Sequence, residues 1–154
     1  MIFQQTAVPG AAMPRSMQLA RRHQALLLIV LLAFALRINQ LTFHSLELDE
    51  AVSIRLARAT LPDLIINTIN LRWDPHPPFY YSMLHVWIRL LGENDVVVKW
   101  LGVAASTLTP LIVFALAHRL SRSTAVGLLA ALLAALAPLE VYNAQQVRMF
   151  ALIP

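Results

Sequence analysis

The feature that most constrains this chain is a pair of apolar runs in its second half, residues 96–117 and 124–139. Lys99 is the only charged residue in either run, and it lies near one end of the first. A helix needs about 20 predominantly apolar residues to cross the ~30 Å hydrocarbon core of a bilayer. We therefore expect both runs to be membrane spans, joined by a short basic turn that contains Arg119 and Arg122.

A third apolar run opens the chain after a polar tail. Residues 25–43 suffice for a span if Arg37 extends its charged end toward the membrane surface. The alternative is a cleaved secretory signal peptide, with Arg21 and Arg22 as its basic flank and Ala33-Phe34-Ala35 as its cleavage site. The two further spans downstream favour an uncleaved anchor.

Composition agrees with a membrane protein. Hydrophobic residues make up 58% of the chain and charged residues only 13%, against about 45–50% and 25% in soluble domains. The absence of cysteine excludes thiolate metal sites and thiol nucleophiles. The net charge of +4 comes from arginines beside apolar runs, where membrane topology explains them, so the expected partner is a lipid bilayer and not nucleic acid. We expect a disordered cytoplasmic tail over residues 1–24 and an all-α polytopic membrane domain over residues 25–154.

Residues 44–95 form the polar interior of the chain, which we expect to be an external loop with surface helices. The spacing predicts a helix over residues 48–59, with one apolar side and one polar side. Its apolar side would carry Leu48, Val52, Leu56 and Ala59, and its polar side Asp49, Glu50 and Ser53. A second short helix is expected from Pro62 to Asn70. A third, about 14 residues long and rich in aromatic side chains, follows the prolines at 75, 77 and 78 and is too short to span.

Two topologies compete. If residues 77–91 span, the chain has four spans, and Arg119 and Arg122 share a side with the acidic loop. If they do not, it has three, and those arginines join the N-terminal ones. The positive-inside rule favours three spans, because every short basic cluster then faces the cytoplasm. The acidic cluster around Asp49, the His76 turn and Arg148 would then all emerge on the external face.

Four side chains on that face can carry chemistry. Asp49 and Glu50 can take a proton from a hydroxyl or bind a divalent cation, although an acidic pair at a helix start also simply complements the helix dipole. His76 is held between two prolines and can direct a donor at an anion. Arg148 offers a planar cation suited to phosphate, and anchoring to lipid headgroups is an equally good interpretation.

These residues also occur in a familiar order. Leu48-Asp49-Glu50-Ala51 follows the first apolar run, and His76-Pro77-Pro78-Phe79-Tyr80-Tyr81 comes next. Two apolar runs later stands Gln145-Gln146-Val147-Arg148-Met149-Phe150. In this order, over residues 25–154, the chain resembles the start of the family 39-type membrane glycosyltransferases. That group has the GT-C fold and includes protein O-mannosyltransferases and aminoarabinose transferases.

The resemblance implies an enzyme that moves a sugar from a polyprenyl-phosphate carrier to a hydroxyl of a glycolipid, polysaccharide or protein. It implies that Asp49 is the base, that Glu50 supports it, and that His76 and Arg148 contact the donor phosphate. Tyr80 would contact substrate, and Gln146 would do so by hydrogen bonding at a position where the family commonly has Glu. No cofactor or metal is expected beyond an optional divalent cation.

Members of that family have several hundred residues and about a dozen spans, so we expect this chain to be the N-terminal portion of a longer protein. The expected location is the bacterial cytoplasmic membrane, with the active side facing outward to the periplasm. The alternatives are a transporter fragment and a non-catalytic membrane anchor or assembly partner. Transport predicts ionisable residues inside the spans, and the two clean runs contain only Lys99.

Overall fold

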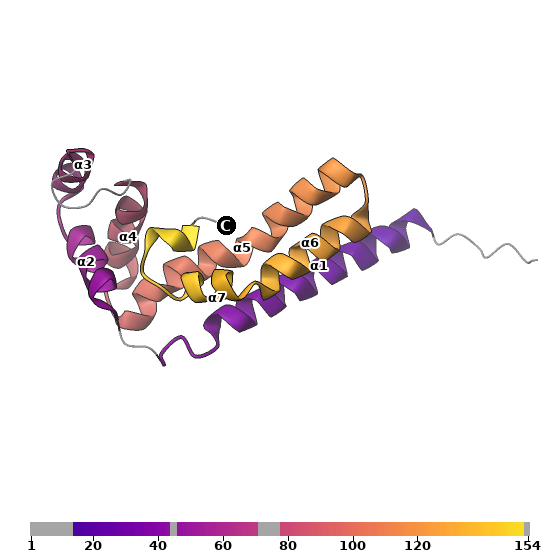
Figure 1. The fold of residues 1–154 in the computed structure, drawn as a ribbon, viewed down its shortest axis with the longest axis horizontal. Coiled ribbons are helices and arrows are strands. Elements are labelled where there is room, and N and C mark those ends of the chain that lie inside the picture. The colour runs from indigo at the N-terminus through magenta and orange to yellow at the C-terminus, as the bar shows by residue number, and fades with distance from the viewer. Residues whose placement is uncertain (1–13, 44–45, 71–77, 153–154) are drawn as a thin grey trace, which may run out of the picture.

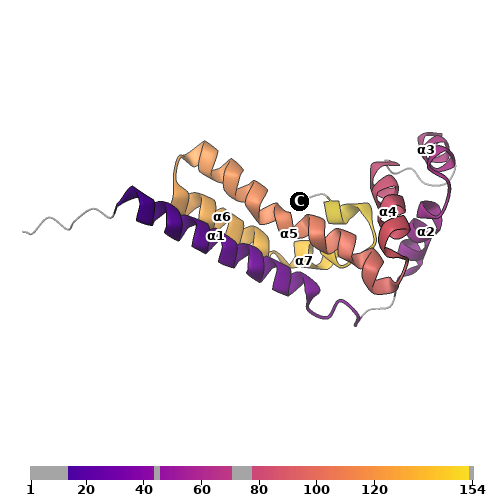
Figure 2. The same cartoon turned by 180° about the vertical axis from the view of Figure 1, so that it is seen from behind.

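The computed structural model describes residues 14–43, 46–70 and 78–152, and in these residues all regular elements are helices. Three helices, α1, α5 and α6, lie side by side and form a long bundle (Figure 1 and Figure 2). The helices are α1 (Arg15–Ile38), α2 (Leu48–Ala57), α3 (Leu61–Ile69), α4 (Pro78–Leu91), α5 (Asp95–Ser121), α6 (Thr124–Leu136), α7 (Pro138–Ala144) and the 3₁₀ helix η1 (Met149–Leu152).

The direction of the bundle helices follows from contacts at its two ends. At one end, Arg37 near the end of α1 bonds to Ser106 in α5 and to Ala135 near the end of α6. At the other end, Arg22 of α1 lies over the ring of Phe114 in α5, 4.8 Å from its centroid. Thus α1 and α6 run in one direction and α5 runs in the opposite one.

Two of these helices, α1 and α5, are long and apolar enough to cross a membrane. Helices α6 and α7 pass the same test only as a pair, because they are bent by 56° at the break between them. Pro138 begins α7, and proline clashes with the preceding turn and lacks the N–H that would continue the α6 hydrogen bonds. The run predicted to be a span, residues 124–139, thus contains a sharp bend after Leu136, and it can count as a span only as part of the bent pair.

The first helix begins earlier than the sequence indicated. Residues 15–24, expected to belong to a disordered tail, form the first turns of α1, which starts directly after Pro14 and ends at Ile38. Past Pro14 this stretch has no further proline or glycine and is rich in good helix formers such as Leu, Ala, Gln and Arg. The expected span over 25–43 also ended too late, because the chain turns at Asn39 and Gln40 has a φ of 60°.

Arg37 does not extend toward a surface, and this prediction was wrong. The residue is 0% exposed. Its Nε donates to Ser106 Oγ at 2.8 Å, and Nη1 donates to the carbonyls of Ala33 and Ala135 at 3.2 and 3.3 Å. Ala33 and Ala135 have small side chains, which leave space for the guanidinium between the three helices.

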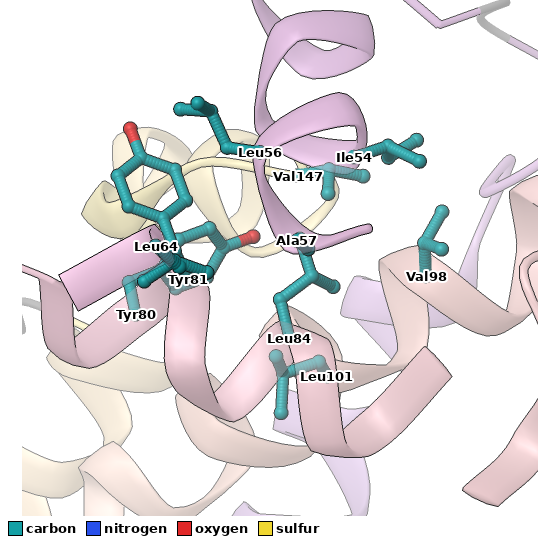
Figure 3. Packing of buried hydrophobic residues seen from close by; sticks show 10 residues of the cluster. All are labelled: Ile54, Leu56, Ala57, Leu64, Tyr80, Tyr81, Leu84, Val98, Leu101 and Val147. Carbon is teal, nitrogen blue, oxygen red and sulfur yellow. The ribbon is translucent and has the colours of Figure 1, made fainter. Parts of the chain in front are cut away.

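Helices α2, α3 and α4 form a separate group, the cap, at the end of the bundle where α1 ends and α5 begins. In both views α4 stands across the long axis of the bundle (Figure 1 and Figure 2). It has 14 residues, in agreement with the expectation that it is too short to span. The cap core is an apolar cluster that reaches from α2 to α5 (Figure 3). Its buried members are Ile54, Leu56, Ala57, Leu64, Tyr80, Tyr81, Leu84, Val98, Leu101 and Val147.

The two predicted sides of α2 are each partly buried. On the apolar side Leu56 is buried, whereas Leu48 is 81% exposed and Val52 is 40% exposed. On the polar side Glu50 and Ser53 are buried, and Glu50 is held there by hydrogen bonds from backbone N–H groups.

Candidate functional site

The site begins at the first turn of α2, where two acidic residues have different environments. Glu47 and Glu50 form a capping box, in which each side chain accepts a hydrogen bond from the backbone N–H of the other residue. Such a box satisfies backbone donors that a helix start otherwise leaves unpaired. It fixes the first turn and directs Asp49 away from the helix toward Arg148.

Glu50 is 3% exposed, and both of its oxygens accept hydrogen bonds from the backbone. Oε2 accepts from the N–H of Glu47 at 2.8 Å, and Oε1 accepts from the N–H of Val147 at 2.6 Å. The second bond joins residues 97 positions apart in the chain. Hydrogen bonds to an ionised group are about twice as strong as neutral ones, so Glu50 firmly connects α2 to the segment that follows α7.

Asp49 and Arg148 form an ion pair across the same junction. Arg148 Nη2 lies 2.9 Å from Asp49 Oδ2, and the side chains are 32% and 60% exposed, respectively. The Arg148 guanidinium also lies over the ring of Phe150, 5.5 Å from its centroid. The structure thus brings together a carboxylate and a guanidinium that an incoming molecule can reach.

Gln146 lies beside this pair but faces inward, with 9% of its surface exposed. It lines a cavity of about 100 Å³, and the other lining residues are Leu41, Glu47, Glu50, Lys99, Tyr142 and Gln145. The neighbouring Gln145 side chain donates to the carbonyls of Arg37 and Asn39 at 3.1 and 2.8 Å. The segment after α7 is therefore held both to the end of α1 and to α2.

Tyr80, expected to contact substrate, is 2% exposed and belongs to the cap core. Its hydroxyl is buried and has no hydrogen-bond partner among the residues that the structure describes. Burial raises the pKa of this hydroxyl strongly, and the negative charge of Glu50 raises it further. In this arrangement Tyr80 is closed to direct contact with a bound molecule, because α2 packs onto α4.

His76 and the residues before it, 71–75, lie outside the described part of the chain, as does Pro77. The description resumes at Pro78, the first residue of α4. Within the cap, a different histidine links two helices, since His85 Nδ1 lies 2.8 Å from the carbonyl oxygen of Ala57.

Lys99 is a member of the site that the sequence did not predict. It is 4% exposed, and its Nζ donates to the carbonyl of Leu41 at 3.3 Å. It lines both the small cavity that contains Glu50 and an open pocket of about 680 Å³, formed by residues 41–43 and the start of α5. The available signal was its position as the one charge in a long apolar run, where an ionisable residue is costly and usually has a function.

Among the described residues, no group of three or more His, Asp or Glu side chains is arranged to hold a metal ion. Asp49 is the open carboxylate, and its partner is the cation Arg148. This pairing favours binding of an anion through Arg148 over binding of a metal through Asp49.

No protein-family model, curated protein or solved structure matches the chain.

Proposed function

We propose that this chain belongs to a multi-pass membrane glycosyltransferase of the GT-C type. It transfers a sugar from a polyprenyl-phosphate donor to an acceptor hydroxyl on a glycolipid, polysaccharide or protein. The reaction takes place at the external, periplasmic face of a bacterial cytoplasmic membrane. Asp49 is the base, Arg148 binds the donor phosphate, and His76 is its second phosphate contact.

The observation that carries the proposal is the ion pair between Asp49 and Arg148. The two residues are far apart in the chain, yet their charged atoms lie 2.9 Å apart at the cap, and both side chains retain exposed surface. An exposed ion pair contributes little to stability, so stability alone gives little reason for this arrangement. A carboxylate beside a phosphate-binding cation is the combination that sugar transfer from a phosphate donor requires.

The chemistry uses the two partners in turn. A donor phosphate competes with Asp49 for the Arg148 guanidinium, because arginine binds phosphate oxygens in the same forked geometry as a carboxylate. Release from Arg148 makes the Asp49 carboxylate available to the acceptor hydroxyl. As the acceptor oxygen bonds to the anomeric carbon, its proton passes to Asp49. The bond from that carbon to the phosphate oxygen breaks, and its electron pair leaves on the phosphate beside Arg148.

The orientation follows from the distribution of arginines. Arg22 and the end of α5, with Arg119 and Arg122, lie at the end of the bundle opposite the cap. Under the positive-inside rule this basic end faces the cytoplasm, so the cap with Asp49 and Arg148 faces outward.

The test is the substitution Asp49→Asn, assayed in membranes with a radiolabelled polyprenyl-phosphate sugar. We expect sugar transfer to fall by about 10²–10⁴-fold, the usual contribution of a general base, with unchanged membrane insertion. Asp63→Asn is the matched control, because Asp63 is an exposed carboxylate in α3 that accepts from the Thr60 hydroxyl at 2.6 Å. Transfer at the wild-type rate by the Asp49→Asn chain would remove this residue from the mechanism.

A further inference from the structure

We infer that Lys99 and Glu50 act together as a positioning pair that holds Arg148 opposite Asp49. The inference concerns the geometry of the site and rests on the proposed function only for its catalytic meaning. Lys99 has no assigned role in the proposed reaction, and it does not form the ion pair itself.

Glu50 supplies the direct link. It is the neighbour of Asp49 in the chain, and its hydrogen-bond partner Val147 is the neighbour of Arg148. The 2.6 Å bond from the Val147 N–H to Glu50 Oε1 therefore joins the two backbones one residue away from the ion pair. Any movement of the segment after α7 away from α2 must break this buried bond before Arg148 can leave Asp49.

Lys99 supplies the opposite charge. It belongs to α5, the longest helix of the bundle, and its Nζ is fixed by the carbonyl of Leu41. It shares the 100 Å³ cavity with Glu50 and Glu47, so a buried cation faces two carboxylates across a small space. Attraction between opposite charges is several-fold stronger in such a partly buried site than in water. This attraction favours the position of the Glu50 carboxylate beside the cavity.

The cavity is also lined by the two residues that precede Val147. Gln146 lines it together with Gln145, and Tyr142 is its remaining titratable group. The cavity has room for about three water molecules, at ~30 Å³ each. Because Gln145 and Gln146 line the cavity with Lys99 and Glu50, and the Val147 N–H bonds to Glu50, we expect the loss of either charge to loosen the segment that carries Arg148.

The experiment measures position without measuring activity. The chain has no cysteine, so the double substitution Asp49→Cys and Arg148→Cys gives a clean pair for a short bifunctional thiol reagent. These substitutions remove the ion pair, so the cross-linking rate depends on the hydrogen bond from the Val147 N–H to Glu50, which keeps the two backbones close. In this background we expect Glu50→Gln and Lys99→Met each to lower the rate about tenfold, the minimum factor for loss of a charged buried hydrogen bond.

Two controls separate positioning from general loss of structure. Lys99→Arg keeps the charge and should stay within about twofold of the background rate, as should Thr107→Val, whose hydroxyl bonds to Val103 inside α5. A second cysteine pair at positions 58 and 93 replaces another ion pair of 2.9 Å, in which neither Lys99 nor Glu50 takes part. Cross-linking of that pair should be unchanged by Lys99→Met.

The outcomes are decisive in either direction. A tenfold lower cross-linking rate between positions 49 and 148, with an unchanged rate between positions 58 and 93, supports the inference that Lys99 and Glu50 position Arg148. An undiminished rate in Lys99→Met, or an equal loss at both cysteine pairs, overturns it. Cross-linking needs no sugar transfer, so the two proposals fail separately. Transfer at the wild-type rate by the Asp49→Asn chain would reject the role of Asp49 in catalysis, and it would leave the Lys99 dependence of cross-linking standing.

Discussion

The bundle and the cap are held together by different means. In the bundle, α1, α5 and α6 approach each other closely where side chains are small, and Ala33, Ala131 and Ala135 are completely buried there. In the cap, aliphatic and aromatic side chains form the core, and polar contacts such as the bond from His85 to Ala57 link the helices. Thus the size of the buried side chains determines how closely the bundle helices pack, whereas particular hydrogen bonds determine how the cap helices are arranged.

This difference has a physical origin. Small residues let helix backbones approach each other, which is the main source of helix packing where the surroundings are as apolar as the helices. The cap helices are 9 to 14 residues long and have less surface to bury, so polar contacts contribute a larger share of their stability. The two regions should therefore respond to different substitutions.

The largest effect is expected for added volume in the bundle. A Cβ atom at Gly127 would lie 3.0 Å from a ring carbon of Phe114 and 3.1 Å from His118 Cβ. Gly127→Leu should therefore force α6 away from α5 and lower the free energy of unfolding by about 3 kcal/mol. Detergent-titrated unfolding measures this, with Ala125→Leu on the exposed side of α6 as the control. Equal stability of the two variants would show that the bundle is loosely packed.

A smaller effect is expected for the hydrogen bond between Arg37 and Ser106, a buried charged contact in the bundle. Ser106→Ala removes the acceptor of Arg37 Nε and leaves a charged donor unpaired in a fully buried position. We expect a loss of about 2 kcal/mol in the free energy of unfolding. Thr107→Val, one residue further along α5, should lose much less, because its hydroxyl bonds within its own helix. A loss of stability in Ser106→Ala as small as that in Thr107→Val would mean that Arg37 finds another acceptor.

In the cap, Tyr80 predicts a dependence on alkaline pH. Its folded-state pKa is raised from 10.0, because burial and the charge of Glu50 disfavour the phenolate. The folded protein therefore retains a proton that the unfolded chain loses, so stability is unaffected below pH ~10 and falls above it by about 1.4 kcal/mol per pH unit. Tyr80→Phe should remove this component and Tyr142→Phe, at a 53% exposed position, should not. Identical alkaline unfolding of all three chains would contradict the prediction.

The smallest effect is expected at the cap surface. Arg58 Nε and Glu93 Oε2 lie 2.9 Å apart, but the side chains are 60% and 51% exposed. Glu93→Gln should change the free energy of unfolding by about 0.5 kcal/mol, and added salt should reduce the difference further. A loss as large as that of Ser106→Ala would remove the contrast between the two regions.

The helices themselves could largely be predicted from the sequence. Helix α4 (Pro78–Leu91) was expected after the prolines, and α2 and α3 begin within a residue of their expected starts. Their periodicity and proline positions are local properties. The burial of Arg37 could not be predicted, because its acceptor Ser106 is 69 residues away and is an ordinary small polar residue in the sequence.

The candidate site divides in the same way. Asp49 and Arg148 could be assigned to one face from topology, and their contact agrees with that prediction. The burial of Glu50 could not be foreseen, because its distant partner is a backbone N–H, which every residue except proline has. Lys99 was visible as an isolated charge, but its neighbours in the cavity come from the segment after α1, from the start of α2, and from α7 and the residues after it.

The bend between α6 and α7 determines where the segment with Arg148 meets the cap. Helix α7 starts at Pro138 with a change of direction of 56° from α6, stays packed against α5 and α1, and ends at Ala144, shortly before Arg148. It therefore connects the bend at Pro138 in the bundle to the segment that carries Arg148 at the ion pair. Three side-chain hydrogen bonds restrain its free end, two from Gln145 to the end of α1 and one from Val147 to Glu50. The bend thus sets the direction in which the chain approaches the cap, and the three bonds hold Arg148 opposite Asp49.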